Sequence, residues 1–436
     1  MTDVPASRTP LGRVVVASFI GTAIEWYDFF LYGTAAALVF PRLFFPTADP
    51  FTGTMAAFAT YAVGFLARPL GGVVFGHFGD RVGRKSVLVA TLMLVGVSTF
   101  LIGCLPTYEA AGPLAPALLV ALRFVQGLGV GGEWAGAVLL VVEHGHARRR
   151  GFHASWVQAG APVGLLLATG AFGLAALLPE DKFLAWGWRV PFLFGIVLTG
   201  VGLFMRFKVL ESPLFQAAQA TPAATPPLLE VIRRHPRNVL LAMGARMAEN
   251  GYYYFFTVFA LTYATQRLGV PRAAVLDGVL IGGVAHLIAT PLFGALSDRV
   301  GRRPVYLGGA AFLAAFAFPF FWLVDSGSVA AVWLGMAVGM VGHAAMYGPQ
   351  AAFLAELFGT RVRYTGASLG YQLAAPLSGG LAPLVATALL AWSGGDPWPV
   401  GIYLIGMAAV TVISVLLVAE THRHDLAGEA DSKRGS

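Results

Sequence analysis

Long apolar stretches separated by short polar segments account for most of this 436-residue chain. A helix needs about 20 apolar residues to cross the hydrocarbon core of a bilayer, and hydropathy identifies twelve such stretches. They lie near residues 13–40, 53–78, 86–106, 114–143, 152–178, 188–207, 238–266, 274–297, 304–324, 329–356, 364–391 and 398–419. Because the stretches are continuously apolar rather than alternating, the pattern predicts membrane-spanning α-helices and argues against a β-barrel.

The composition agrees with a protein that lies mostly within a membrane. Hydrophobic residues make up 57% of the chain and charged residues only 12%, whereas soluble domains carry about 25% charged residues. The single cysteine, Cys104, permits no internal disulfide and no cysteine-based metal site. The first stretch holds two acids and lacks a cleavage pattern after it, so we expect a span rather than a signal peptide.

The net charge of +7 would suit a nucleic-acid partner, but its distribution indicates membrane topology instead. If both termini are cytoplasmic, 21 of the 29 lysine and arginine residues fall in cytoplasmic segments and five in outer segments. This bias follows the positive-inside rule and predicts cytoplasmic termini. The remaining three, Arg68, Arg123 and Arg246, fall inside spans. We therefore expect a lipid bilayer around the chain and no nucleic acid.

Two sequence motifs each occur twice, about half the chain apart. FGHFGDRVGRK at 75–85 matches FGALSDRVGRR at 293–303, and EHGHARRRGFHAS at 143–155 matches ELFGTRVRYTGAS at 356–368. The chain is thus predicted to be an all-α integral membrane protein with two parallel six-helix halves that rock about a central site. The predicted parts are an N-terminal six-helix bundle over 1–208, a cytoplasmic linker over 209–237, a C-terminal six-helix bundle over 238–420 and a cytoplasmic tail over 421–436.

The repeated loop suits a gate. Its glycines permit a tight turn, and its aspartate can cap the next helix or meet the N-terminus of a neighbouring helix. A purely topological anchor would also explain the basic residues, but repetition in both halves favours a clasp that breaks when the halves rock. The residues of this predicted clasp are Gly79, Asp80, Arg81, Gly83, Arg84, Glu143 and Arg150 in the first half and Asp298, Arg299, Gly301, Arg302, Glu356 and Arg363 in the second.

These loops and the stretch RFVQGLGVGGEW at 123–134 resemble motifs of the major facilitator superfamily. Further segments resemble its metabolite:proton symporter family, whose members carry α-ketoglutarate, citrate, shikimate, dicarboxylates, and proline or betaine. These segments are EWYDFFLYG at 25–33, RPLGG at 68–72, GGEW at 131–134, WGWRVPF at 186–192, ESPLF at 211–215 and ELFGTRVRYTGAS at 356–368. The resemblance extends from the first span to the eleventh.

The resemblance implies a proton-driven importer with alternating access, acting as a monomer in the bacterial inner membrane without cofactor or metal. It also places Asp80, Arg81, Gly83 and Arg84 at the signature-loop positions, with Gly79 just before them. In the second copy Ser297 replaces Gly79, and Pro304 follows the basic pair. We therefore expect the second loop to be stiffer and its clasp less complete.

Acids within the spans are the main candidates for carrying protons, since an ionisable group at that depth is functional by default. Glu25 and Asp28 lie one turn apart in the first span, and Glu133 lies near the centre of the fourth. Arginine cannot exchange the proton because it stays charged. The alternative role of each acid is a fixed ion pair with Arg68 or Arg123.

Polar residues near these acids are candidates for binding substrate or tuning the acids. Arg123 has Gln126 one turn away, and the resemblance assigns such an arginine to proton coupling. Arg68 can dock a substrate carboxylate through a bidentate pair, or form a salt bridge to an acid of the first span.

In the seventh span Arg246, Asn250 and Tyr253 share a stripe that suits an anionic or zwitterionic ligand, or serves hydrogen bonding between helices. Glu249 is expected to pair locally. The tenth span places His343, Tyr347 and Gln350 on one face. The residues predicted to bind substrate are Arg68, Gln126, Arg246, Asn250, Tyr253, Tyr347 and Gln350. Glu249 is a further candidate proton carrier, and His286 and His343 are less favoured ones.

Other functions fit less well. The chain has no Walker loop and no metal-binding spacing, and its polar segments are too short for a catalytic domain, so we do not expect an enzyme. A channel would not need the repeat, and GAPVG at 160–164 matches an exporter element only in part. The sequence predicts a proton symporter for a small carboxylate-bearing metabolite, with a zwitterionic osmolyte such as betaine or proline as the alternative.

Overall fold

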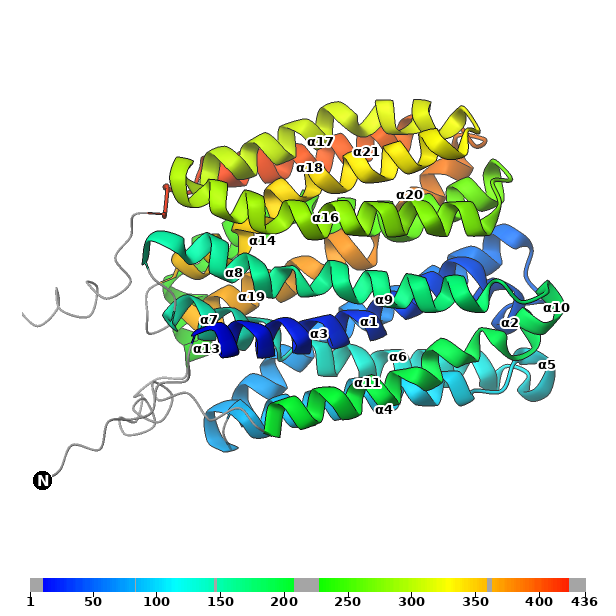
Figure 1. Ribbon diagram of the computed structural model, residues 1–436, viewed down its shortest axis with the longest axis horizontal. Helices are drawn as coiled ribbons and strands as arrows, with labels where there is room; N and C mark the ends of the chain where they lie inside the picture. The colour runs from blue at the N-terminus through cyan, green and yellow to red at the C-terminus, as the bar shows by residue number, and fades with distance from the viewer. Residues whose placement is uncertain (1–10, 83, 145–146, 208–226, 359–362, 423–436) are drawn as a thin grey trace, which may run out of the picture.

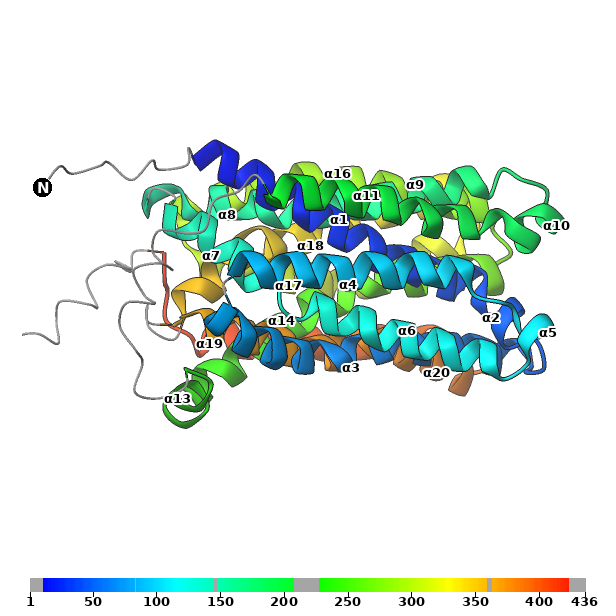
Figure 2. The same cartoon turned by 90° about the horizontal axis from the view of Figure 1, so that it is seen from below.

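The computed structural model is an elongated bundle of helices (Figures 1 and 2) and describes residues 11–82, 84–144, 147–207, 227–358 and 363–422. A backbone surrounded by lipid must satisfy its hydrogen bonds within each span, which is why apolar stretches of this length become helices. The described residues of the first half form α1 (Leu11–Leu38), α2 (Phe40–Phe44), α3 (Pro50–Val82), α4 (Arg84–Cys104), α5 (Tyr108–Ala111), α6 (Leu114–Val130), α7 (Trp134–His144), η1 (Ala147–Arg149), α8 (Arg150–Gln158), α9 (Gly160–Ala175), α10 (Glu180–Lys182), η2 (Phe183–Gly187) and α11 (Arg189–Phe207).

The second half repeats this all-helical construction. It contains α13 (Pro227–Arg234), α14 (Pro236–Tyr254), η3 (Phe255–Phe259), α15 (Ala260–Thr262), η4 (Tyr263–Arg267), α16 (Arg272–Val300), α17 (Arg302–Asp325), α18 (Val329–Glu356), α19 (Arg363–Ala375), η5 (Pro376–Gly380), α20 (Ala382–Trp392) and α21 (Trp398–Leu416). Helix α13 lies within the predicted linker, of which residues 209–226 are outside the described part. The predicted tail lies outside it from residue 423 onward.

All twelve apolar stretches are helical. Nine helices in the described ranges are long and apolar enough to span a membrane, and the bent pair Glu180–Gly187 and Arg189–Phe204 makes a tenth. The other two are α4, whose apolar part Val89–Cys104 is short, and the segment from α14 to η4, which carries buried charges. The prediction of an all-α membrane protein is confirmed.

The helices pack as two groups with a seam between them. In the first group α1 packs on α9, α3 on α6 and α4 on α11, and in the second α16 and α17 pack on α18, and α14 on α19 and α21. Across the seam α8 contacts α16 and α18, and α3 contacts α19 (Figures 1 and 2). We call the end of the bundle where α1 begins the signature-loop end, and the end with α2, α5 and α10 the far end (Figure 1).

Helix α6 approaches α3 closely because two of its glycines leave space. A β-carbon on Gly127 would overlap the carbonyl of Gly64, and one on Gly131 would overlap the carbonyl of Arg68. The absence of a side chain at these two glycines thus lets α3 approach α6. The two helices that carry Arg68 and Arg123 are therefore in backbone contact.

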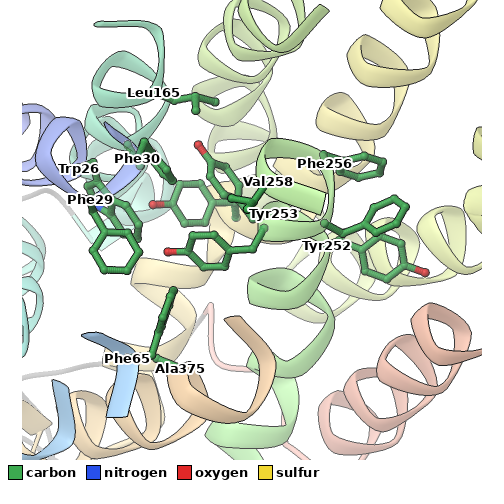
Figure 3. Packing of buried hydrophobic residues seen from close by; sticks show 14 of the residues in the cluster. Trp26, Phe29, Phe30, Phe65, Leu165, Tyr252, Tyr253, Phe256, Val258 and Ala375 are labelled. Carbon is green, nitrogen blue, oxygen red and sulfur yellow. The ribbon is translucent and has the colours of Figure 1, made fainter. Parts of the chain in front are cut away.

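Aromatic rings fill the middle of the seam. Figure 3 shows Phe30 of α1 near Tyr253 of α14, with Phe29 of α1 and Phe65 of α3 on the same side of the cluster. The ring centroids of Phe30 and Tyr253 are 5.3 Å apart, and those of Phe65 and Tyr254 are 4.9 Å apart. The charged and amide side chains of the candidate site lie around this cluster.

Candidate functional site

Two arginines of the first half lie against one aromatic ring. The guanidinium carbons of Arg68 and Arg123 are 4.0 and 4.1 Å from the ring centroid of Phe29, and both side chains are buried. Such cation–π contacts are stronger away from water than at a surface. The structure thus brings together two predicted site residues, one from α3 and one from α6.

Neither arginine is fully satisfied by the described residues. The Nε and Nη2 atoms of both Arg68 and Arg123 lack a hydrogen-bond partner there, although Arg123 Nη1 donates to Gln126 Oε1. A buried cation is costly unless it is paired, and free guanidinium donors match a carboxylate. This part of the first half therefore has the chemistry of an anion site.

Asp28 is fully buried on a different side of α1. Both of its carboxylate oxygens lack a hydrogen-bond partner in the described part of the chain. Its Oδ1 lies 3.1 Å from the point where a β-carbon on Gly195 would sit, and Thr99 borders the same space. The fixed ion pair with Arg68 or Arg123 considered for Asp28 is thus not formed.

A hydrogen-bonded chain connects the surroundings of Asp28 with the arginines. Arg123 donates to Gln126, and Gln126 Nε2 donates to Thr99 Oγ1 at 2.7 Å. Thr99 borders the space that holds the Asp28 carboxylate. The hydrogen-bonded chain from Arg123 therefore ends beside Asp28, and the Asp28 carboxylate does not contact Arg123 directly.

The other two predicted acids are buried as well. Glu25 lies in α1, and Glu133 lies in the break between α6 and α7. They are 5% and 3% exposed, respectively, so both are removed from water as the sequence predicted.

Arg246 in α14 has a full set of partners. It donates from Nε to Glu249 Oε2 and from Nη2 to Asn250 Oδ1, each at 3.2 Å, and from Nη1 to the Tyr371 carbonyl. Asn250 Nδ2 donates in turn to Ser378 Oγ in η5 at 2.9 Å. The expected local pairing of Glu249 is confirmed, and its partner is Arg246.

A chain of side chains connects this group to the first half. Trp134 Nε1 donates to Gln158 Oε1 at 2.9 Å, and Gln158 Nε2 donates to Gln350 Oε1 at 3.1 Å. Gln350 Nε2 then donates to Glu249 Oε2 at 2.6 Å. The Glu249 carboxylate, which pairs with Arg246, is thus connected by hydrogen bonds through Gln350 to Gln158 in the first half.

The space between these groups is closed. A cavity that leaves about 10 Å³ for the centre of a water molecule has room for about one water. It is lined by Trp26, Ala161, Glu249, Asn250, Tyr253, Tyr254 and Tyr347. Three predicted substrate residues are in this lining, and the cavity is too small for a metabolite in this structure.

At the signature-loop end, the second copy of the repeated loop forms a clasp across the seam. Asp298 accepts from the backbone N–H groups of Gly151 and Phe152, each at 2.8 Å. It thereby meets the positive N-terminus of α8, as the sequence suggested. Arg302 donates to Asp298 at 2.7 Å and to Glu356 at 3.2 Å, so clasp residues far apart in sequence form one network.

Ser297 strengthens this second copy. Its Oγ accepts from Arg302 Nη1 at 2.7 Å, and Thr421 Oγ1 donates to Glu356 Oε2 at 2.7 Å. Among the other predicted residues Arg150 and Arg363 are buried and Arg299 is exposed, while Gly301 adopts a φ of +106° that favours glycine.

For most of the predicted clasp residues of the first copy, the side chains are outside the described part of the chain. The side chains of Gly79, Asp80, Arg81, Arg84 and Glu143, and residue Gly83 as a whole, lie outside the described residues. Whether the second clasp is the less complete one therefore stays a prediction.

The far end is closed too. Glu180 in α10 accepts from Arg42 at 2.5 Å and lies 3.8 Å from Arg272, which begins α16 of the other group. Thr54 Oγ1 lies 3.4 Å from Gln266 Oε1 across the same seam. The two groups of helices thus touch at both ends, with the small cavity between them.

The sequence reasoning missed several polar side chains of the site. Gln158, Thr99 and Ser378 carry hydrogen bonds that connect the predicted residues. Each is a polar residue within a predicted apolar span, which is a signal available from the sequence. Trp134 belongs to the GGEW motif, which does not predict that its ring stacks on Tyr371 with centroids 3.8 Å apart.

Comparison with known proteins gives the family. The family model described as Major Facilitator Superfamily matches residues 18–372 and 287–435. The Escherichia coli (strain K12) shikimate transporter is 44% identical over 417 residues, covering 94% of this chain and 95% of the relative. The proline/betaine transporter of the same organism is 34% identical over 434 residues, covering 96% and 85%.

A further relative and a solved structure agree with this. The inner membrane metabolite transport protein YhjE of Escherichia coli (strain K12) is 43% identical, covering 95% of each chain. A crystal structure of the D-xylose-proton symporter superimposes with a TM-score of 0.71 at 20% identity, covering 95% of this chain and 99% of that one. At that identity the likeness shows the fold alone.

Proposed function

This chain belongs to the Major Facilitator Superfamily of membrane transporters, and on that premise we propose that it imports a small organic acid together with protons by alternating access. The observation that carries the proposal is Arg68. It is buried beside the cavity residue Trp26, with its guanidinium carbon 5.5 Å from that ring, and two of its nitrogens lack partners among the described residues. A substrate carboxylate would supply the missing anion.

The proposed substrate site lies between the two halves. Arg68 approaches it from the first half, and Asn250, Tyr253 and Tyr347 line the cavity from the second. Because the cavity now holds about one water, the substrate enters when one end of the seam opens. The clasp at Asp298 would control the signature-loop end, which the positive-inside rule assigns to the cytoplasm.

Asp28 is the proposed carrier of the coupling proton. An unpaired carboxylate is costly to bury, and a proton on Asp28 removes that cost. Protonation of Asp28 would change the charge beside Thr99, which is hydrogen-bonded through Gln126 to Arg123 at the anion site. Glu25 and Glu133 remain the alternatives.

Transport assays in liposomes test substrate and direction. Purified protein is reconstituted in a known orientation, a proton gradient is imposed in either direction, and labelled shikimate is followed. We expect accumulation when the outer face is acidic. Accumulation only in the reverse orientation would indicate an exporter.

Coupling is tested by Asp28→Asn. We expect loss of accumulation against a gradient while shikimate counterflow exchange persists, because exchange needs no net proton movement. The control is Asp277→Asn, which alters an exposed acid in α16. Undiminished accumulation by Asp28→Asn would move the proton site to Glu25 or Glu133.

A zwitterionic osmolyte is the second candidate. The cavity lining includes Trp26, Tyr253, Tyr254 and Tyr347, and such aromatic faces bind quaternary ammonium groups. A relative at 34% identity is a proline/betaine transporter. Glycine betaine in place of shikimate in the same assay decides between the two substrate classes. The names of the relatives further support a bacterial inner membrane as the location.

A further inference from the structure

Two histidines that the proposed function leaves unused are hydrogen-bonded together behind the cavity. His286 in α16 and His343 in α18 are both fully buried, and His343 Nδ1 is 2.8 Å from His286 Nε2. The rings of Tyr253 and Tyr347 lie against both histidines, with centroids 4.9 to 5.4 Å away. These tyrosines also line the cavity, so the histidine pair is one ring away from the substrate site.

The carbonyl of Glu249 fixes where the hydrogens lie. His343 Nε2 is 2.8 Å from that oxygen, and a carbonyl can only accept, so Nε2 carries a hydrogen. In a neutral His343 the other nitrogen, Nδ1, is then an acceptor, and His286 Nε2 donates to it. The remaining atom, His286 Nδ1, is left as a bare acceptor without a partner in the described part of the chain.

We propose that the His286–His343 pair binds a second coupling proton and thereby frees Arg246 for the substrate. A proton from water bonds to His286 Nδ1, and the hydrogen on His286 Nε2 moves to His343 Nδ1. His343 then has hydrogen on both nitrogens and carries the positive charge. His286 is neutral again, with its hydrogen on Nδ1, so one proton taken up yields one new charge.

The new charge lies beside the carboxylate that holds Arg246. His343 Nε2 is 3.7 Å from Glu249 Oε1, and Arg246 Nε is 3.2 Å from Glu249 Oε2. Once His343 is charged, His343 and Arg246 share the Glu249 carboxylate. The positive charge of Arg246 is then only partly neutralised, and Arg246 can attract a substrate anion. Proton and anion then bind with positive coupling, each raising the affinity for the other.

The other groups facing the pair do not compete for this role. Helix α14 contributes Tyr253 and the bound pair Glu249 and Arg246, and α18 contributes Tyr347. Helix α9 presents Leu165 and Leu166 to Gly283, which lies one turn before His286. Glu249 is therefore the anion that can stabilise the protonated pair within the described surroundings.

The variant His286→Gln removes the proton-accepting nitrogen but keeps a side chain that can fill the same space. Its amide can still donate to His343 Nδ1, but it offers no imidazole nitrogen that accepts a proton. Purified protein with ¹⁵N-labelled histidine is titrated by NMR without substrate. We expect a coupled pair of histidine resonances to titrate in the wild-type protein and to vanish in His286→Gln. If every titrating resonance survives in the variant, the proposal is wrong.

Transport gives an independent readout that rests on the proposed symport. Initial rates of proton and labelled shikimate entry give the number of protons per substrate. We expect this ratio to fall by one in His286→Gln, while counterflow exchange continues, and to be unchanged in His235→Gln, the residue just before α14. An unchanged ratio in His286→Gln would overturn the proposal. If the wild-type protein carries neither shikimate nor glycine betaine, the proposed function fails, and the NMR titration still decides the proton site.

Discussion

The buried arginines of the two halves are in opposite situations. Arg68 and Arg123 lie on the ring of Phe29 with two nitrogens each unpartnered among the described residues. Arg246 instead donates to Glu249, to Asn250 and to a carbonyl. A cation that is neutralised within the protein holds one structure together, whereas a cation without a partner is stabilised by an arriving anion. In this structure Arg246 is thus neutralised within the protein, whereas Arg68 and Arg123 keep donors that suit the anion of the proposed substrate.

At the signature-loop end of the second half, a further buried arginine is also paired with carboxylates. Arg302 is held by Asp298 and Glu356, and the aspartate reaches α8 of the first half. Substitutions in the two halves should therefore have different signatures. In the first half they should affect transport with little effect on stability, and in the second half they should affect stability or opening.

The largest effect is expected for Arg68→Gln. A charge-assisted hydrogen bond to a carboxylate is worth up to about 3 kcal/mol, so we expect shikimate uptake to fall about 100-fold at limiting substrate. Thermal stability should change little, because the lost cation–π contact with Phe29 is offset by removal of a buried charge that lacks an anionic partner among the described residues. Uptake in liposomes and a thermal unfolding curve measure both. Arg68→Lys, which keeps the charge but not the planar fork, should retain part of the uptake, and wild-type uptake by Arg68→Gln would remove Arg68 from the anion site.

Arg246→Gln should destabilise the fold by about 3–5 kcal/mol, because it leaves the Glu249 carboxylate buried without its cation. Unfolding in increasing denaturant measures this loss. The double variant Arg246→Gln with Glu249→Gln removes both charges and should regain most of the stability. If Arg68→Gln proves as destabilising as Arg246→Gln, the contrast between the halves does not hold.

Asp298→Asn should loosen the signature-loop end, because it weakens the pair with Arg302 and the contact with the α8 N-terminus. A loss of about 1.4 kcal/mol changes an opening equilibrium about tenfold. Ser155 is buried against Gly294 at this contact, so a Ser155→Cys reporter in a Cys104→Ser background should react about tenfold faster with a thiol reagent. Equal labelling rates with and without Asp298→Asn would show that Asp298 does not hold the gate.

The smallest effect is expected for Glu420→Gln and depends on pH. Partial burial alone would raise the pKa of Glu420, but backbone N–H groups of Arg302, His422, Arg303 and Thr421 outweigh it and hold the pKa below the ordinary 4.5. A lowered pKa contributes stability above 4.5 that is lost as the pH falls through the folded-state value. Glu420 caps α17, because it accepts from the backbone N–H groups of Arg302 and Arg303 at the start of that helix. Loss of a helix cap costs about 1 kcal/mol, so the melting temperatures of wild type and variant should differ at pH 7 and converge in acid. A pH-independent difference would contradict this account.

Some features of the molecule follow from the sequence alone. Apolar length gives the spans, and the repeated DRVGR motif gives the two halves. The short Asp298 side chain next to a turn predicts contact with a helix N-terminus, which the structure shows. In each case one local property, whether length, repetition or side-chain reach, is sufficient for the inference.

The partners of the buried charges do not follow in this way. Periodicity shows which residues share a face of a helix, but not which neighbour that face meets. Asp28 and Phe29 differ by about 100° around α1, and it is Phe29 that contacts the arginines while Asp28 lies near Gly195. Gln158 and the link from His286 to His343 depend on contacts across helices, which one sequence does not specify.

The glycine contacts between α3 and α6 have a consequence for selectivity. Because Gly127 and Gly131 seat one backbone on the other, Arg68 and Arg123 are mounted on a single rigid frame. In the proposed alternating-access cycle, rocking of the halves would change their distance to Tyr253 and Asn250 but not the spacing between the two guanidinium groups. We therefore expect the fixed spacing of the two guanidinium groups to select substrates by the size and separation of their anionic groups. Contacts from the second half would form and break as the substrate is bound and released.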